Sequence, residues 1–224
     1  MVDDVTRWNT IHQKIHKDEE GHSVYAEEKE KLFPKGSVIC DLGGGSGGDA
    51  IYFLKQGHSV IVLDISDFAL ELTRSKAKAV GYADKLVTKH MDFGLHELPI
   101  KDNSVDIAYS RLSLHYFGKT RTSEMFNDIY RFIKPNGTAY LTFKSPKDEA
   151  EMERLQAVAS VYEENVYIEG GQLRSRFTVE QLKQILKDAG IKSCTVNPYQ
   201  EMLGVKGTGK HELLLQNEVV FTKK

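Results

Sequence analysis

The sequence predicts an α/β fold: a doubly wound, mostly parallel seven-stranded sheet that ends in an antiparallel pair of strands. Short apolar runs alternate with helix-length segments between residues 37 and 144, and such alternation implies a parallel sheet. The last two strand-like runs follow one another with no helical period between them, so they should pair antiparallel. Glycines cluster where the first strand turns into the first helix, which allows a close backbone turn.

The first half of this pattern is marked by apolar strands and by residues that begin and end helices. Ser66 is placed as a helix N-cap, and Gly57 and Gly81 stand where helices should stop. The expected strands are 37–42, 58–64 and 85–90, and the expected helices are 49–56 and 67–80.

The second half repeats the pattern and then leaves it. The turn Pro135-Asn136-Gly137 should stop a helix, and Thr178 and Gly190 are placed as the start and stop of the last helix. A Gly-rich loop should join the last two strands. The expected strands are 104–110, 138–144, 191–196 and 213–222, and the expected helices are 122–133 and 179–189.

Composition and charge exclude several classes of protein. Thirty basic and 32 acidic side chains leave a formal net charge of -2, so no global field would hold a nucleic acid, and none is expected as a partner. No stretch approaches the roughly 20 apolar residues that span a membrane. Cys40 and Cys194 lie in apolar surroundings typical of buried thiols in a reducing compartment, so we expect a cytoplasmic protein. The oligomeric state stays open.

The glycine cluster lies in the segment Asp41-Leu42-Gly43-Gly44-Gly45-Ser46-Gly47-Gly48. Its residues fit two sequence patterns, the dinucleotide-binding pattern GxGxxG and the pattern DxGxGxG of methyltransferases. Asp64 ends the second strand, where it is placed to accept hydrogen bonds from ribose hydroxyls under either pattern. An anionic Asp41 suits a sulfonium and ammonium ligand better than a pyrophosphate, which it would repel.

From Gly36 to the carboxyl terminus the sequence resembles the class I S-adenosylmethionine-dependent methyltransferases. The resemblance rests on several segments in the family's order and spacing, since no single segment decides it. These segments are 38–47 with the glycines, Val62-Leu63-Asp64-Ile65-Ser66, His90-Met91-Asp92-Phe93, 104–110 with Leu98-Pro99 before it, 112–117, and 129–138.

The resemblance implies a Rossmann-like fold, S-adenosylmethionine as cofactor, S-adenosylhomocysteine as product and a small-molecule methyl acceptor. It places the glycines behind the methionine moiety, Asp64 at the ribose, and Asp92 with Phe93 at the adenine. The milder alternative is that these residues serve turn geometry and strand-end capping. The implied cofactor-binding residues are Asp41, Gly43, Gly44, Gly45, Asp64, Ile65, Asp92, Phe93 and Ser110.

The resemblance also suggests how residues 1–224 divide within a single domain. Residues 37–144 would form the cofactor-binding core and residues 178–224 the C-terminal helix and strand pair. Residues 1–36 are polar with aromatic residues and an expected helix around residues 8–16, so they are expected to form a helical lid. Residues 145–177 lie outside the repeat and would form a substrate-side insertion, although their charges also suit a solvated face.

Methyl transfer from a sulfonium needs mainly alignment of the acceptor and removal of its proton. His115 follows the fourth strand and is a candidate general base, although a packing histidine fits its apolar surroundings better. His12 and His16 have the spacing of a metal-binding pair, but no third ligand is evident and we expect no metal.

Other functions fit parts of the sequence. A nicotinamide-dependent oxidoreductase would explain the GxGxxG match and Asp64. An S-adenosylmethionine-binding regulatory protein without turnover would explain the lack of an obligatory catalytic signature. Methylation of RNA or protein would require a basic surface stripe that the sequence does not reveal.

Overall fold

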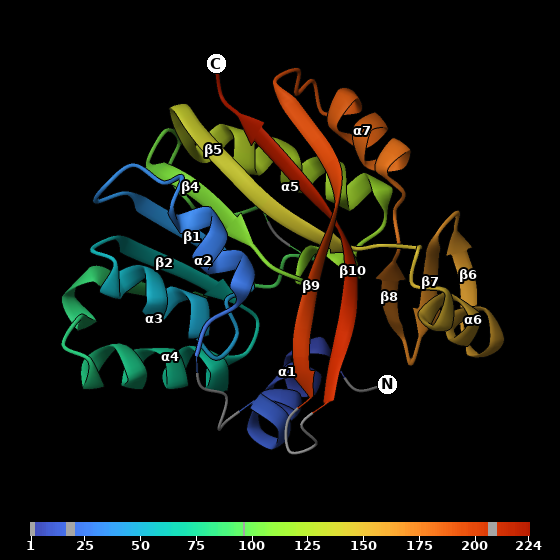
Figure 1. Cartoon of the computed structure of the whole chain (residues 1–224), viewed down its shortest axis with the longest axis horizontal. Coiled ribbons are helices and arrows are strands. Elements are labelled where there is room, and N and C mark those ends of the chain that lie inside the picture. The colour runs from blue at the N-terminus through green and yellow to red at the C-terminus, as the bar shows by residue number, and fades with distance from the viewer. Residues whose placement is uncertain (1–2, 17–20, 96, 206–209) are drawn as a thin grey trace.

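The main sheet of the protein is the predicted one. The computed structural model describes residues 3–16, 21–95, 97–205 and 210–224. Seven strands pair in the order β3-β2-β1-β4-β5-β10-β9 (Figure 1). The first five strands along the chain run parallel, and β10 is antiparallel to both β5 and β9. The α/β fold with its antiparallel end is therefore confirmed.

The parallel strands match the apolar runs of the sequence within a few residues. They are β1 (Val38–Leu42), β2 (Ser59–Asp64), β3 (Leu86–His90), β4 (Val105–Ser110) and β5 (Ile133–Lys144). The strand β5 begins earlier than predicted, because Ile133 already pairs with Val105 before an irregularity in the β4–β5 ladder. The Pro135-Asn136-Gly137 turn lies in this irregularity, where Asn136 has φ +66°. Strand order reverses between β1 and β4, and this point is where α/β sheets bind ligands.

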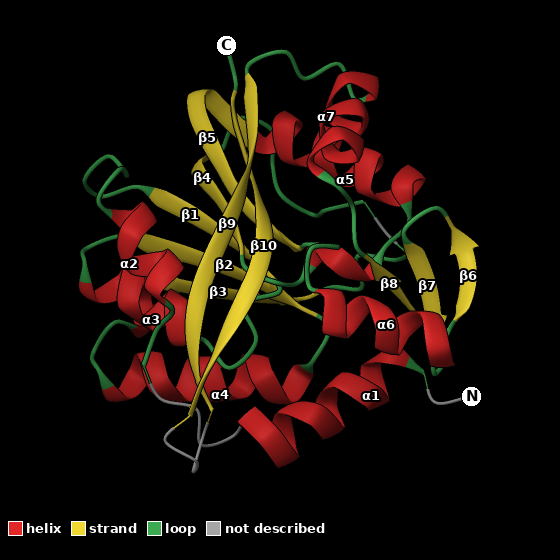
Figure 2. Cartoon of the chain, turned by 45° about the vertical axis from the view of Figure 1, so that its right-hand side comes forward, coloured by secondary structure: helices red, strands yellow, loops and turns green. Residues whose placement is uncertain are grey.

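Helices cover both faces of the sheet, as Figures 1 and 2 show. Side chains of a strand alternate between faces, so β1 sends Ile39 into the core beneath one helical layer and Cys40 into the core beneath the other. The first layer consists of α2 (Val24–Glu30), α3 (Gly48–Lys55) and α4 (Asp67–Ala79), and the second of α5 (Lys119–Phe132) and α7 (Val179–Asp188). The predicted caps are present, since Ser66 accepts a hydrogen bond from the amide of Ala69 and Thr178 forms a capping box with Gln181.

The last two strands are longer than the sequence predicted. β9 spans Cys194–Val205 and β10 spans Lys210–Thr222, and their ladder continues outward to the pair of Val205 and Lys210. The segment expected as a Gly-rich loop is thus largely paired strand, and its residues 206–209 lie outside the described residues. Only the part of β10 from Gln216 onward pairs with β5 among the described residues, so the outer half is a two-stranded ribbon.

The segments outside the repeat contain more structure than the sequence indicated. The lead-in forms α1 (Asp4–Ile11), a short π-helix η1 (His12–His16) and the helix α2, which sequence analysis missed. The side chain of His16 lies outside the described residues. Residues 145–177 form α6 (Glu149–Val158) and a separate antiparallel sheet of β6 (Ser160–Glu163), β7 (Val166–Glu169) and β8 (Gln172–Ser175). Two short 3-10 helices are η2 (Ala83–Lys85) and η3 (Leu114–Tyr116).

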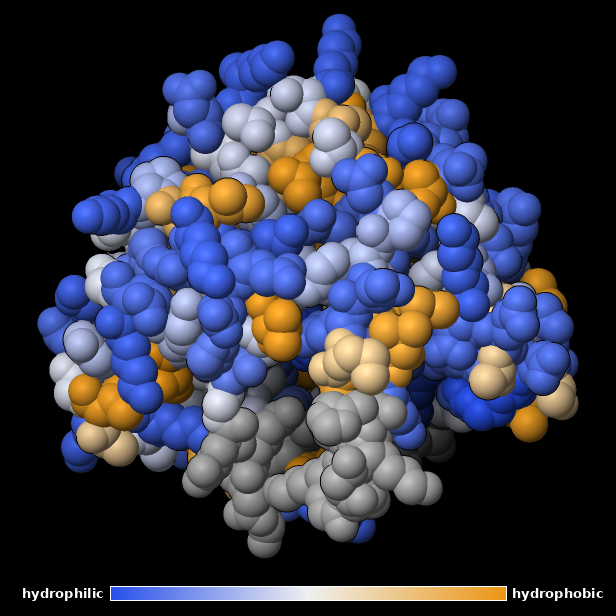
Figure 3. All heavy atoms as spheres, viewed as in Figure 1, coloured by the Kyte–Doolittle hydropathy of each residue, from blue (hydrophilic) through white to orange (hydrophobic). Residues whose placement is uncertain are grey.

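The surface shown in Figure 3 is mostly hydrophilic, and its hydrophobic residues form small groups separated by polar ones. Exposed apolar side chains on the outer ribbon include Met202, 53% exposed, and Leu213, 49% exposed. Among the described helices, none combines the length and the apolar composition that crossing a membrane requires.

Candidate active site at the carboxyl end of the sheet

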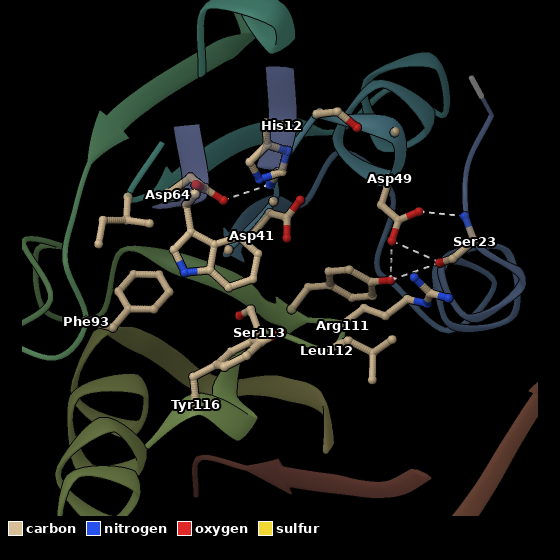
Figure 4. Close-up of a pocket in the computed structure, with 18 of the residues that line it drawn as sticks. His12, Ser23, Asp41, Asp49, Asp64, Phe93, Arg111, Leu112, Ser113 and Tyr116 are labelled. Atoms are coloured by element: carbon tan, nitrogen blue, oxygen red, sulfur yellow. Dashed lines mark hydrogen bonds between the residues drawn. The ribbon is translucent and has the colours of Figure 1, made fainter. Parts of the chain in front are cut away.

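A cavity of about 640 Å³ lies at the carboxyl ends of the parallel strands, beside the point where strand order reverses. This volume falls within the range of sites that hold small molecules and cofactors. Figure 4 shows its lining side chains pointing inward from several elements. Eight predicted cofactor-binding residues are brought together on its wall, namely Asp41, Gly43, Gly44, Gly45, Asp64, Ile65, Asp92 and Phe93.

The glycine turn after β1 is packed too closely for larger side chains. Gly43 has φ +73°, and a Cβ there would lie 2.3 Å from the Cβ of Ser113. A Cβ on Gly44 would lie 2.7 Å from Oδ2 of Asp41. Without these side chains, the backbone forms the floor of the cavity and a ligand can approach it closely.

Asp41 is buried beside this turn, 2% exposed, and its Oδ2 has no hydrogen-bond partner among the described residues. Burial raises the pKa of this carboxyl group, and the nearby carboxylates of Asp49 and Asp64 raise it further. A buried carboxyl oxygen without a partner is costly unless a ligand supplies a donor or a positive charge. Asp41 therefore suits a cationic group in the cavity.

Asp64 is held rigidly at the end of β2. Its Oδ2 accepts the amide hydrogen of Gly45 at 2.9 Å, and its Oδ1 accepts that of Ser66 at 2.8 Å. Burial raises its pKa, while these two hydrogen bonds act in the opposite direction. A carboxylate has about four acceptor sites, so two remain for donors in the cavity, such as a pair of ribose hydroxyls.

Two predicted residues are close to the cavity but absent from its described lining. Ser110 is fully buried and its hydroxyl donates to the carbonyl of Leu42 at 2.8 Å, which ties β4 to the end of β1. His115 is 2% exposed, and burial together with Arg176, Lys144 and Arg174 lowers its pKa well below the usual value. The roles assigned to these two residues stay predictions, and the packing alternative suits the surroundings of His115.

A cluster that sequence analysis missed fixes the segment that precedes α2. Asp49, in the first turn of α3, accepts the amide and hydroxyl hydrogens of Ser23 at 2.7 and 2.9 Å (Figure 4). It also accepts the hydroxyl hydrogen of Tyr109 at 2.7 Å. These three donors satisfy the carboxylate, so Asp49 holds Ser23 against the cavity instead of offering a free charge.

A second missed pair lies on the side of β9. Arg111, just after β4, donates from Nε and Nη2 to the carboxylate of Glu201 at 3.1 and 2.9 Å. Both residues line the cavity, and Glu201 is 4% exposed. The next residue, Leu112, has φ +57°, a conformation that costs a branched residue free energy and brings its side chain to the cavity wall. Because the paired residues are 90 positions apart, no local pattern could reveal them.

The helix α1 closes another side of the cavity. Trp8 of α1 and His12, the first residue of η1, line it, and the Trp8 ring contacts the ring of Tyr116 edge-on, with centroids 5.1 Å apart. Asn9 accepts the hydroxyl hydrogen of Ser66 at 2.8 Å and the amide hydrogen of Phe68 at 3.1 Å. The same Ser66 donates its amide to Asp64, so the docking of α1 is linked to the carboxylate at the end of β2.

These features fit a cationic nucleoside. The cavity combines an unpartnered buried carboxyl oxygen at Asp41, free acceptor capacity at Asp64 and an apolar side chain at Phe93. A nucleoside that carries a sulfonium and an amino group would match these features. Its positive charge would suit Asp41, its ribose hydroxyls Asp64 and its flat base Phe93.

Comparison with known proteins points in the same direction. Residues 39–137 match a family described as "Methyltransferase domain". The chain is 33% identical over 116 residues to a sarcosine/dimethylglycine N-methyltransferase of Aphanothece halophytica, covering 51% of this chain and 40% of that protein. It is 34% identical over 142 residues to a ubiquinone/menaquinone biosynthesis C-methyltransferase of Ruegeria sp. (strain TM1040), covering 62% and 53%. The chain thus spans about half or less of these relatives.

Among solved structures, the fold is similar to that of a Burkholderia thailandensis 1,6-didemethyltoxoflavin-N1-methyltransferase with bound 1,6-didemethyltoxoflavin and S-adenosylhomocysteine. The TM-score is 0.64, with 16% sequence identity over 99% of this chain and 86% of that one. At this identity the likeness concerns the fold, and it extends over almost the whole chain.

Proposed function

The chain contains a class I S-adenosylmethionine-dependent methyltransferase domain, and from this premise we propose that it transfers a methyl group to a small-molecule acceptor. The observation that carries the proposal is the cavity in which Asp41, the glycine turn and Asp64 meet at the carboxyl ends of β1 and β2.

In this proposal the chain binds the cofactor along one wall of the cavity. Asp41 would receive the positively charged amino group through its unpartnered oxygen, and Asp64 would accept the ribose hydroxyls. Asp92 and Phe93, which follow β3, would border the adenine. The backbone of Gly43 and Gly45 would support the methionine moiety, because these positions have no side chain to obstruct it.

When bound, S-adenosylmethionine supplies a methyl group on a positively charged sulfur, which is already a good leaving group. The residues of the chain then need chiefly to orient the acceptor and to exclude water. Tyr109 remains protonated, since burial and the neighbouring Asp49 raise its pKa well above the usual value. Its hydroxyl serves to hold Asp49, so we assign catalysis mainly to alignment by the walls of the cavity.

A small molecule is the acceptor class that the cavity favours. Its walls come from α1, the segment before α2, β8 and the ribbon of β9, so they surround the space beyond the glycine turn. Relatives named for sarcosine, for a quinone pathway and for toxoflavin support small acceptors in general, and they differ in the atom that is methylated.

Calorimetric titration tests the cofactor part of this proposal. We expect S-adenosylmethionine and S-adenosylhomocysteine to bind the purified protein, and NAD to give no signal. Binding of NAD without either sulfur nucleoside would instead favour an oxidoreductase.

A labelling experiment tests the acceptor part. The protein is incubated with methyl-labelled S-adenosylmethionine and a cell extract separated into small molecules, RNA and protein. We expect label in the small-molecule fraction. Label confined to RNA or protein would contradict the proposal, and binding of the cofactor with no labelled fraction would favour a regulatory protein.

A further inference from the structure

Gln172 is a buried polar side chain that faces the cavity from a part of the chain outside the matched family region. It begins β8 and pairs across the hairpin with Glu169 of β7. The tip of this hairpin is held by Arg7 of α1, whose guanidinium donates to the carbonyl of Gly170 at 2.6 Å. The hairpin, α1 and the cavity therefore meet at Gln172.

The side-chain oxygen of Gln172 is unsatisfied. The residue is 5% exposed, and its Oε1 has no hydrogen-bond partner among the described residues. Leaving a buried amide group unpaired costs free energy, so a water, an ion or a ligand that can reach it is a favourable partner. Gln172 lines the same space as the proposed cofactor residues, so a turn of its amide would bring Oε1 within reach of a donor in that space.

The surroundings of Gln172 indicate the shape of that molecule. Side chains two positions apart in a strand share a face, so Gln172 and Arg174 lie on the same side of β8. The Arg174 guanidinium lies over the ring of Tyr116, 4.8 Å from its centroid, which places this face toward η3. Tyr116 in turn meets Trp8 edge-on, and both rings line the cavity. Flat apolar surfaces thus border the amide.

The charges at this end of the cavity are already balanced. Arg111 is paired in two hydrogen bonds with Glu201, and Asp49 is satisfied by Ser23 and Tyr109. A charged acceptor would therefore gain no unpaired counter-charge from these residues, and burying its charge is costly. An uncharged acceptor avoids this cost.

We propose that Gln172 is a specificity-determining residue that hydrogen-bonds an N–H or O–H group of a flat, uncharged methyl acceptor resting against Trp8 and Tyr116. The inference rests on the proposed methyltransferase function and adds to it the chemical class of the acceptor. It also assigns part of acceptor recognition to the inserted hairpin.

Two probes of nearly the same shape test this proposal. Indole carries an N–H donor, whereas benzofuran has an oxygen in its place. Binding of each to the protein saturated with S-adenosylhomocysteine is measured by calorimetry. We expect indole to bind at least about tenfold more tightly, the effect of one hydrogen bond to a buried partner. Equal binding, no binding of either probe, or tighter binding of charged sarcosine or phosphoethanolamine would overturn the proposal.

Substitution then tests the residue itself. Gln172→Met keeps the length of the side chain and removes both polar groups, so it should abolish the preference for indole and leave the affinity for S-adenosylhomocysteine within about twofold. Its melting temperature should not fall, because an unpaired buried group is removed. A preference for indole that persists in Gln172→Met would refute the role of this residue.

Ser175→Ala is the matched control. Ser175 lies on the same strand, is fully buried and has a hydroxyl without a partner among the described residues, but it is on the opposite face and outside the cavity lining. We expect this variant to keep the preference for indole. If the wild-type protein does not bind S-adenosylhomocysteine, the methyltransferase proposal fails. If it binds the nucleoside and shows no preference between the probes, the assignment of Gln172 alone fails.

Discussion

Replacing Gly43 by alanine should damage both the stability of the fold and the cofactor site. The new Cβ would lie 2.3 Å from the Cβ of Ser113 and 2.4 Å from its Oγ, which is far inside van der Waals contact. Ser113 cannot move freely, since its hydroxyl donates to the carbonyl of Leu42 at 2.7 Å and meets that of Ser110 at 2.9 Å. The turn after β4 must therefore shift away from the turn after β1.

The magnitude follows from two costs. A residue with a Cβ at φ +73° loses about 1–2 kcal/mol relative to glycine. Crowding a well-packed site costs about 1–3 kcal/mol more. Gly43→Ala should thus lower the free energy of unfolding by about 2–5 kcal/mol. We also expect at least tenfold weaker binding of S-adenosylhomocysteine, because both turns border the cavity.

Gly81→Ala is the control for backbone conformation. Gly81 has φ +81°, but no atom of the described residues lies within 4 Å of its Cβ position, so Gly81→Ala has the backbone cost without the crowding cost. Urea denaturation gives the free energy of unfolding of each variant, and calorimetry gives the affinity of each variant for S-adenosylhomocysteine. Equal destabilisation by both variants, with cofactor binding unchanged in Gly43→Ala, would refute the reasoning from close packing.

Three further predictions concern other contacts. Asp64→Ala should weaken binding of S-adenosylhomocysteine about a hundredfold or more in calorimetry, because two charge-assisted hydrogen bonds are lost, each contributing about 1.5–3 kcal/mol; unchanged affinity would contradict the assignment. Asn9→Ala removes an acceptor that holds α1, so the fluorescence of Trp8, the single tryptophan, should shift toward that of a water-exposed indole; an unchanged spectrum would show that α1 docks without it. Burial alone would raise the pKa of Glu151, but hydrogen bonds from Arg176 and Lys144 outweigh it and lower this pKa to about 2. The ionised Glu151 therefore stabilises the fold at pH values above its usual pKa, and this stabilisation is lost as the pH falls toward 2. Urea denaturation of Glu151→Gln should show a smaller loss of stability over that range, and an identical pH profile would contradict the reasoning.

The sequence was sufficient for the features that depend on neighbouring residues. Alternating apolar runs predicted the parallel strands, and local capping residues such as Ser66 and Thr178 marked helix starts. The predicted ligand residues also converge, because parallel strands end at one edge and each of these residues lies at or just after the end of a strand. The structure adds that Ser110 is directed into a hydrogen bond with the backbone, which its position at the end of β4 did not indicate.

The features that the sequence did not reveal depend on distant segments. Gln172 approaches the cavity on the hairpin of β7 and β8, which is held by distant segments; one of its contacts is the hydrogen bond from Arg7 to Gly170, 163 positions away. The small sheet was missed because its strands are four residues long and too short to show a clear alternation. The outer part of the β9–β10 ribbon was taken for a loop because its glycines are unusual in strands.

The construction of that ribbon has a consequence for the opening of the cavity. The inner part of β10 is held on both sides, by β5 and by β9, whereas the part before Leu215 has β9 as its described partner. Isolated two-stranded ribbons are marginally stable, so this part should open with a smaller free energy than the sheet itself. Glu201 and Met202 belong to it, so this wall of the cavity is held by the pairing of β9 with β10 and by the Arg111–Glu201 pair. Hydrogen exchange should accordingly be faster in residues 200–203 than in β5.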